Sequence, residues 1–369
     1  MAHREPALDD ELDALLQRAI ARGIFTAASV AVGDAGSEII RFGIGRTRAV
    51  PDAGEMCDST AIFDLASLTK PIATAAIAMK LVARGALALD DLATRWIGAR
   101  GAALDPRITA EHLLGHGSGL PPHIKLYEQL RAGQRAGQAT ARDALIALAA
   151  AQPLEAAPGA RAAYSDLGYA LAGAMVEGAG GAPLEDLFAR EIVGPLGLER
   201  TRYVDLTKPK IAWPTPVVAT EVDVPPGEVH DENAHAAGGV CGHAGLFGDA
   251  VDVSRFARAI IAAANGDATI FEPQIVRTFL DTSAGPSTTW RLGWDTPSRT
   301  PGVSNAGDAW PRNGGVGHLG FTGTSMWLDL PRRRWLVLLT NRVHPSRTRP
   351  EAALIKEIRR AAGDLVATL

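Results

Sequence analysis

This chain has few cysteines, no excess of positive charge and no long apolar run, and each of these absences argues against a class of protein. Cys57 and Cys241 are the only cysteines. They form neither a CxxC pair nor a metal-ligand spacing, so we expect two ordinary buried thiols rather than a disulfide framework. The formal net charge is -4, so the sequence does not predict a basic surface, and nucleic acid is a poor candidate partner. No window approaches the unbroken apolar length of a membrane span.

The rest of the composition is that of a globular protein. Of 369 residues, 47% are hydrophobic and 21% are charged, which allows a sizeable core in one large domain or two moderate ones. The first residues lack the apolar segment of a secretory signal, so the chain as given is expected in the cytoplasm. A trimmed mature form of a periplasmic or secreted protein would look the same.

Hydrophobic periodicity predicts both strands and helices in the first part of the chain. Apolar residues at helical spacing over 12–20 indicate a helix, with Asp9 or Asp10 as its cap and Gly23 as its stop. Residues 27–45 then indicate a hairpin of two apolar strands. A further helix is expected to follow Ser67 and to end at Gly85, and from there to about residue 240 the pattern is mostly helical.

The C-terminal part changes character. An amphipathic helix is expected over 251–266, two strands over 321–330 and 332–342, and a last helix over 350–369. The expected fold class is therefore α/β (α+β): a largely antiparallel sheet built from both chain termini and flanked by helices, plus an inserted helical region. The expected boundaries are 1–80 and 241–369 for the sheet domain and 81–240 for the mainly helical domain, with the active site between them.

The first candidate for chemistry is Ser67-Leu68-Thr69-Lys70, at the transition from an apolar strand to a helix. Ser and Lys three residues apart on a helix lie on the same face, about one turn apart. A helix N-terminus adds free N–H groups that can stabilise an oxyanion, and a neutral Lys can take the Ser proton. The spacing alone is weak evidence, because a capping Ser followed by a solvated Lys has the same pattern.

Two further segments are candidates on weaker grounds. Tyr164-Ser165-Asp166 precedes an apolar helical run, so Ser165 or Asp166 could simply be its N-cap and Tyr164 a half-buried aromatic. A phenol becomes a usable base only if neighbouring cations lower its pKa. The segment from His318 to Gly323 leads into a C-terminal strand, and a Gly-rich edge strand lets a substrate backbone approach closely.

Dinucleotide and metal sites are less consistent with the sequence. Residues 315–320 fit G-x-G-x-x-G, but a polar loop precedes them and a strand follows, which is the wrong context for a nucleotide fingerprint. Several histidines and one aspartate could suggest a metal site, yet their order matches no recognised ligand motif. We expect loop histidines that make backbone hydrogen bonds instead. The residues considered are His112, His116, His230, Asp231, His235 and His243. No metal is predicted.

Together, these segments resemble the superfamily of serine β-lactamases and penicillin-binding proteins, whose members carry S-x-x-K, then Y-x-N or Y-S-D, then K-T-G or H-x-G. The ordered counterparts here are Ser67 to Lys70, Tyr164 to Asp166, and His318 to Gly320. Blocks such as FDLASLTKPIAT, YSDLGYALAG, VHDENA and LTNRVHPSR extend the resemblance over about residues 25 to 346. They look closest to a subgroup of low-activity penicillin-binding proteins and muramyl-peptide amidases, and family VIII carboxylesterases share the motifs.

The resemblance implies a role for each motif residue. Ser67 is the acylated nucleophile, Lys70 its activating base or the group that holds Tyr164 as phenolate, and Tyr164 the residue that passes the proton to the leaving group. The N–H groups of Ser67 and Phe321 form the oxyanion hole beside Gly320. His318 takes the place of the family's Lys.

Two motif positions depart from the commoner family pattern. Asp166 replaces an Asn by a carboxylate, and His318 replaces a permanent cation by a group that is mostly neutral at pH 7. Both put efficient β-lactam hydrolysis in doubt. The polar segment around Asn233 is expected to contribute to substrate choice, unless it is a structural loop making backbone hydrogen bonds.

The sequence therefore predicts acyl transfer to water through a Ser67 acyl-enzyme, on a small-molecule or peptide substrate such as a cell-wall peptide or muramyl-peptide. No metal or organic cofactor is expected. Two alternatives stay open: a promiscuous carboxylesterase with weak β-lactamase activity, and a catalytically idle protein that senses peptides or β-lactams.

Overall fold

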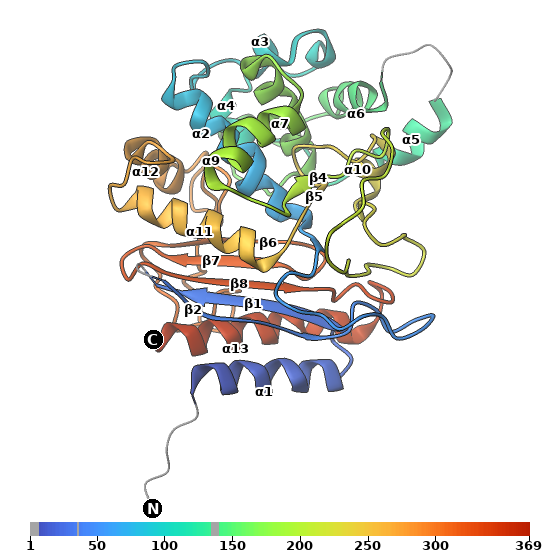
Figure 1. The fold of residues 1–369 in the computed structure, drawn as a ribbon. Coiled ribbons are helices and arrows are strands. Elements are labelled where there is room, and N and C mark those ends of the chain that lie inside the picture. Colours follow the sequence, from blue (N-terminus) through green and yellow to red (C-terminus); the bar gives the residue numbers. More distant parts are fainter. Residues whose placement is uncertain (1–6, 35–36, 134–139) are drawn as a thin grey trace, which may run out of the picture.

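A computed structural model describes residues 7–34, 37–133 and 140–369, and a five-stranded antiparallel sheet lies at its centre (Figure 1). The strand order is β2-β1-β8-β7-β6, so strands from both ends of the chain pair through β1 and β8. This confirms the expected sheet built from both termini. The strands are β1 (Ala27–Gly33), β2 (Glu38–Gly45), β6 (Gly315–Leu319), β7 (Ser325–Asp329) and β8 (Arg334–Thr340).

Both faces of this sheet are buried because its side chains alternate between two apolar cores. In β1, Val30 and Val32 pack in the core between the sheet and helices α1 (Leu8–Ala21) and α13 (Ile355–Ala367). Ala31 belongs to the larger core on the opposite face of the sheet. Figure 1 shows α1 and α13 on one side of the sheet and α11 on the other. The sheet is therefore a central layer that carries β6 at one edge.

The remaining helices gather mainly above this sheet, in a mixed α/β arrangement (Figure 1). They are α2 (Ala76–Ala83), α3 (Ala93–Ile97), α4 (Ala110–Leu114), α5 (Leu126–Gly133), α6 (Ala141–Ala150), α7 (Asp166–Gly180), α8 (Leu184–Phe188), α9 (Gly194–Leu196), α10 (Glu232–Ala236), α11 (Ala250–Ala264) and α12 (Pro273–Asp281). Short 3-10 turns span Ala66–Leu68, Gly98–Gly101 and Pro350–Leu354, and π-helical turns span Lys70–Ala75 and Ala189–Val193.

A second, three-stranded sheet connects the helical region to the segment that leads into Ser67. Its order is β3 (Phe63–Asp64), β5 (Leu246–Gly248) and β4 (Arg202–Tyr203). Strand β4 lies inside the stretch 81–240 that we expected to be helical, and β3 ends just before Ser67. The division into two domains at those boundaries stays a prediction.

The structure corrects several expected element boundaries. Helix α1 begins at Leu8 after Ala7, which makes no side-chain cap, so neither Asp9 nor Asp10 is the N-cap; both lie in the first turn. The C-terminal sheet region holds three strands instead of two, because the glycine-rich residues 315–319 pair along β7 as an edge strand.

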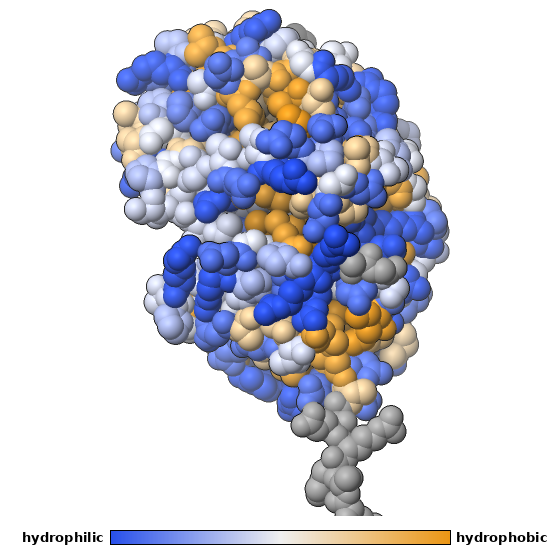
Figure 2. Space-filling model, turned by 90° about the vertical axis from the view of Figure 1, so that its left-hand side faces the viewer, coloured by the Kyte–Doolittle hydropathy of each residue, from blue (hydrophilic) through white to orange (hydrophobic). Residues whose placement is uncertain are grey.

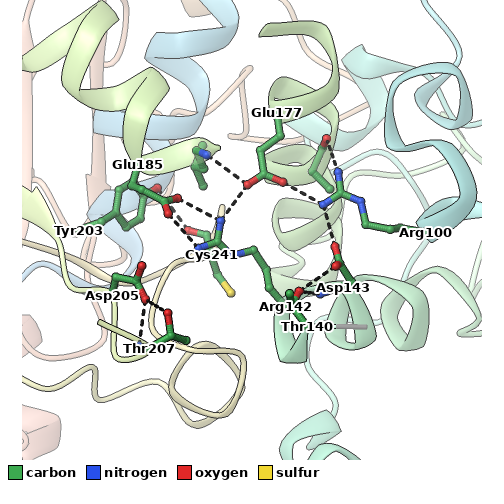
Figure 3. A network of polar contacts seen from close by, with 12 residues as sticks. Arg100, Thr140, Arg142, Asp143, Glu177, Glu185, Tyr203, Asp205, Thr207 and Cys241 are labelled. Carbon is green, nitrogen blue, oxygen red and sulfur yellow. Dashed lines mark hydrogen bonds and ion pairs between the residues drawn. The ribbon is translucent and has the colours of Figure 1, made fainter. Parts of the chain in front are cut away.

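An ion-pair network holds the helical region together (Figure 3). Arg142 on α6 lies 2.9 Å from Glu177 on α7 and 3.0 Å from Glu185 on α8. Arg100 lies 3.0 Å from the other oxygen of Glu177 and 3.2 Å from Asp143. Because Glu177 is shared by both guanidinium groups, the network couples four helical segments and fixes their mutual orientation.

Both cysteines are free and buried, as the sequence predicted. Burial raises the pKa of Cys57 to about 11 and raises that of Cys241 further. A thiol with so high a pKa is a poor nucleophile at neutral pH, so neither cysteine is a candidate for the chemistry.

Two features bear on whether the chain could insert into a membrane: its apolar surface and one apolar helical segment. The face in Figure 2 carries separate apolar patches among hydrophilic residues. Ala66–Ala83 is long and apolar enough to cross a membrane by length and composition alone. Lys70 and Lys80 interrupt its apolar run, so it is not the unbroken span that the sequence was expected to lack. However, 78% of this segment is buried inside the molecule, which is the situation of a core helix.

Candidate active site

The backbone around Ser67 is held in an unusual conformation. Ala66, directly before it, has a φ of 47°, a left-handed value that costs free energy for a residue with a Cβ. The Asp64 carboxylate holds this bend by accepting the N–H of Ala66 at 2.8 Å and that of His230 at 2.8 Å. The strained turn places Ser67 in a 3-10 turn at the start of the helical stretch that leads into α2.

The Ser67 hydroxyl receives two side-chain hydrogen bonds. Lys70 Nζ donates to Ser67 Oγ at 3.1 Å, and the Tyr164 hydroxyl donates to the same atom at 2.7 Å. Lys70 begins a π-helical turn, a feature often found at functional sites, and its side chain is fully buried. Its ammonium also donates to Asp166 Oδ1 at 2.8 Å and to the carbonyl of His243 at 3.1 Å. The structure therefore brings four side chains of the first two motifs, those of Ser67, Lys70, Tyr164 and Asp166, into one hydrogen-bonded cluster.

Ser165, rather than Asp166, is the N-cap of α7. Its hydroxyl accepts the N–H of Gly168 at 3.0 Å, which leaves the Asp166 carboxylate free to pair with Lys70. The sequence left both residues open as the cap, and the structure decides between them.

Burial and charge act against each other in this cluster. Burial lowers the pKa of Lys70, while the carboxylate of Asp166 opposes that shift. Burial also opposes ionisation of Asp166, but Lys70, His123 and His243 together overcome that effect and lower the pKa of Asp166. Burial and then the charge of Asp166 raise the pKa of Tyr164 well above its usual range. The phenol of Tyr164 is therefore neutral, and it lies beside a lysine whose pKa burial lowers.

Two residues beside this cluster were not expected from the sequence. His123 Nδ1 lies 3.7 Å from Asp166 Oδ2, and that contact raises the pKa of the half-exposed imidazole. Trp290 packs 5.0 Å from the Tyr164 ring and 5.8 Å from the His318 ring, measured between centroids. Neither residue lies in a recognisable motif, so only the folded chain could reveal them.

His318 is buried and held by its own backbone. Its Nδ1 lies 2.8 Å from the carbonyl oxygen of Leu319, and its Nε2 has no hydrogen-bond partner within the described residues. Burial, helped by the positive charge of Lys70, lowers the pKa of His318 to about 3. With so low a pKa the imidazole is neutral between pH 6 and pH 8, more firmly than an ordinary histidine would be.

A cavity of about 790 Å³ opens at this cluster. Its lining includes Ser67, Tyr164 and Asp166 from the first two motifs, and His318, Gly320 and Phe321 from the third motif and the residue after it. Cationic residues of the C-terminal region complete the wall: Arg342, Arg347, Lys356 and Arg359. Six of the eight residues expected in the site thus line one cavity, and Lys70 lies behind Ser67.

Comparison with known proteins supports what this geometry suggests. The sequence model of the Beta-lactamase family matches residues 12–360. This chain belongs to the Beta-lactamase family. It is a hydrolase of the β-lactamase superfamily with that superfamily's mixed α/β fold of antiparallel sheets and many helices.

Two curated relatives and one solved structure describe the neighbourhood of this β-lactamase-family chain. A protein named N-acetylmuramyl-L-alanine amidase from Bacillus subtilis (strain 168) is 30% identical over 92% of this chain and 82% of its own length. A protein from Escherichia coli (strain K12) named as a D-alanyl-D-alanine carboxypeptidase is 30% identical over 77% of this chain and 69% of its own. The structure of EstCE1, described as a hydrolase with promiscuous acyltransferase activity, aligns with a TM-score of 0.71 at 22% identity, covering 97% of this chain and 98% of that one.

Asn233 is the predicted site residue that lies apart from both the cavity lining and the hydrogen-bonded cluster around Ser67. It lies on α10, within a segment that we expected to be a loop, and its amide donates to the carbonyl of Ile124 at 2.8 Å. Its side-chain oxygen accepts the N–H of Tyr127 at 2.9 Å. Asn233 therefore ties α10 to residues 124–127, which supports the structural alternative for this residue. Asp231, the N-cap of α10, does line the cavity.

The histidines considered as metal ligands have other partners. His112 closes a capping box with Thr109, and His116 Nδ1 accepts the N–H of Ser165 at 3.1 Å. His230 and His243 lie 3.0 Å from Glu221 and Asp231 respectively. Over the residues that the structure describes, no group of three or more His, Cys, Asp or Glu side chains is placed to hold a metal ion.

Proposed function

We propose that this chain hydrolyses an amide or ester through a covalent acyl-enzyme on Ser67. One observation carries the proposal: the Ser67 hydroxyl lies within hydrogen-bond distance of both Lys70 Nζ, at 3.1 Å, and the Tyr164 hydroxyl, at 2.7 Å. A nucleophile and its proton-handling groups must meet at such distances. The proposal uses only side chains and backbone groups of this chain.

The electrostatics suggest the order of proton transfers. Because the pKa of Tyr164 is raised, the phenol stays protonated in the resting enzyme, and Lys70 in its neutral form is the group that accepts the Ser67 proton. Ser67 Oγ then forms the bond to the substrate carbonyl carbon. Tyr164, next to Ser67, passes a proton to the leaving group, and a water molecule releases the acyl group by the same steps in reverse.

The shape and charge of the cavity support a peptide substrate that carries carboxylates. Arg342 and Lys356 line the wall, and neither of them forms an ion pair with a carboxylate among the described residues. Such a wall attracts an anionic substrate. The names of the relatives, an amidase and a carboxypeptidase, make a cell-wall peptide or muramyl-peptide the leading class. A periplasmic or secreted location would fit that substrate.

A promiscuous carboxylesterase is the second candidate. It is favoured by the neutral, buried His318, since the position offers no cation to the carboxylate of a β-lactam or free-acid peptide. The name of EstCE1 points the same way. A catalytically idle sensor of peptides or β-lactams is a third possibility, against which the intact hydrogen bonds around Ser67 argue.

Intact-protein mass spectrometry tests the proposal. The enzyme is exposed to a panel of esters, D-Ala peptides and muramyl-peptides, and separately to a fluorophosphonate and a labelled penicillin. We expect an acyl adduct on Ser67 that turns over with one substrate class, and no adduct in Ser67→Ala, whose turnover falls by at least about a thousandfold. A Ser67→Ala enzyme that keeps a tenth of the activity would refute the nucleophile. A stable adduct without turnover would favour the sensor.

A further inference from the structure

The turn between β6 and β7 is built so that no side chain can occupy its first residue. Gly320 donates its N–H to the carbonyl of Thr324 at 2.7 Å, which closes the turn. A Cβ added at Gly320 would collide with Thr324 Oγ1 and with the carbonyl oxygen of Leu65. The backbone at Gly320 therefore lies directly against the segment that leads into Ser67.

Two threonines fasten this turn to the nucleophile segment. Thr322 Oγ1 donates to the carbonyl of Asp64 at 2.8 Å, and Thr324 Oγ1 donates to the carbonyl of Leu65 at 3.0 Å. Within the described part of the chain, the N–H of Phe321 donates no hydrogen bond, although Phe321 lines the cavity beside Ser67. A backbone donor without an acceptor at the edge of a cavity is available to a ligand.

The other end of that same peptide group is held by a buried cation. Arg359, on α13, is 6% exposed, and its Nη2 donates to the carbonyl of Gly320 at 2.9 Å and to that of Thr324 at 2.8 Å. Among the described residues no carboxylate pairs with Arg359, and its Nε has no hydrogen-bond partner. Burial lowers the pKa of Arg359 to about 9, which leaves the guanidinium charged at neutral pH.

A buried charge without a counterion is costly, so its position calls for an explanation. The carbonyl of Gly320 and the N–H of Phe321 belong to one planar peptide group and point in opposite directions. A donor that fixes the carbonyl therefore also fixes the direction of the N–H. A positive charge at the carbonyl oxygen draws electron density through the peptide and makes the N–H a stronger donor.

We propose that Arg359 is a positioning residue that orients and polarises the Gly320–Phe321 peptide, so that the Phe321 N–H stabilises the oxyanion formed when Ser67 attacks a carbonyl. The inference rests on the proposed function of Ser67 and extends it to a residue that no motif contains. The guanidinium acts through the peptide and does not touch the substrate carbonyl. A neutral side chain at this position would leave the same backbone donor less well aimed and less polarised.

Arg359→Met removes the guanidinium while keeping an unbranched side chain, and Arg202→Met is its matched control. Arg202 Nη2 also donates to two carbonyls, those of Ile211 and Ala212, each at 3.0 Å, but away from the cavity. We expect Arg359→Met to lower kcat by between about tenfold and a hundredfold with little change in KM, less than the loss of an oxyanion donor outright. Arg202→Met should leave kcat unchanged.

The deciding measurement is the carbonyl stretching frequency of the Ser67 acyl-enzyme, taken by infrared difference spectroscopy with a ¹³C-labelled ester. A polarised carbonyl absorbs at lower frequency, so Arg359→Met should shift the band upwards relative to the parent and to Arg202→Met. If Arg359→Met does not fold, Arg359→Gln, which keeps an N–H donor without the charge, is expected to give the same upward shift.

A folded variant that still acylates at Ser67 with the parent frequency and kcat would overturn the role of Arg359 and leave the nucleophile intact. Failure of the parent enzyme to acylate at Ser67 would instead refute the proposed function itself. The two failures are therefore distinguishable in the same set of spectra.

Discussion

Lys70 and Arg359 are both buried cations beside the same cavity, yet their surroundings differ. Lys70 faces a carboxylate, Asp166, at 2.8 Å, and burial and that charge pull its pKa in opposite directions. Arg359 donates to the carbonyls of Gly320 and Thr324, and no carboxylate among the described residues pairs with it. The difference suits the two tasks we propose. Lys70 must take up and release a proton, so opposing effects on its pKa are useful. Arg359 only polarises a peptide group, so it must keep its charge. An arginine suits the second task because its pKa stays high even when it is buried.

The largest loss of activity should come from changing Lys70 or Tyr164, the two residues that we propose handle the proton of Ser67. Lys70→Ala and Tyr164→Phe should each lower kcat/KM by about a thousandfold, and the double variant should be no worse than the poorer single one, because the two groups act on one hydroxyl. A complete double-mutant cycle measures this. Losses that multiply would mean that Lys70 and Tyr164 act independently.

Asp166→Asn sharpens the comparison because it leaves Lys70, like Arg359, as a buried cation without a counterion. The carboxylate favours the ammonium form of Lys70, so its removal lowers the pKa of Lys70 further. If neutral Lys70 is the base, the acidic limb of the pH profile of kcat/KM should move to lower pH, by about 1 to 3 units.

Asp231→Asn is the control for that shift. Asp231 also favours the Lys70 ammonium, but its carboxylate contacts His243 at 3.0 Å and not Lys70, so its removal should move the limb less. The other groups around Lys70 are neutral: the Tyr164 and Tyr169 rings and the carbonyl of His243. An acidic limb that stays in place in Asp166→Asn would exclude neutral Lys70 as the base.

The smallest effect is expected at His318, which lies between the two cations. With a pKa lowered to about 3, the imidazole stays neutral from pH 6 to pH 8, so it should not improve KM for carboxylate-bearing substrates as pH falls. The ratio of KM for acidic and neutral substrates should be the same in the parent and in His318→Gln across that range. A gain for acidic substrates at pH 6 that His318→Gln abolishes would show that the imidazole is protonated in the complex.

Local pattern was enough to predict the sheet from both termini and the helices at its two ends, and it also showed the order of the three motifs. The apolar run of β1 and the helical spacing in α1 and α11 are properties of a few neighbouring residues. The spacing of Ser67 and Lys70 is local as well. The helix α10 was missed because its five residues, with Asn233 among them, are too few for a periodic signal.

The sequence by itself thus determined which residues are able to do chemistry, and the tertiary structure decided what surrounds them. Asp166 lies 96 positions from Lys70, and Gly320 lies 39 positions from Arg359. The same fold buries His318 and so keeps it neutral, and it turns Asn233 away from the cavity. Burial sets each pKa, and contacts between residues far apart in the sequence set each hydrogen-bond partner. Burial and such contacts exist only once the layers of the fold have packed.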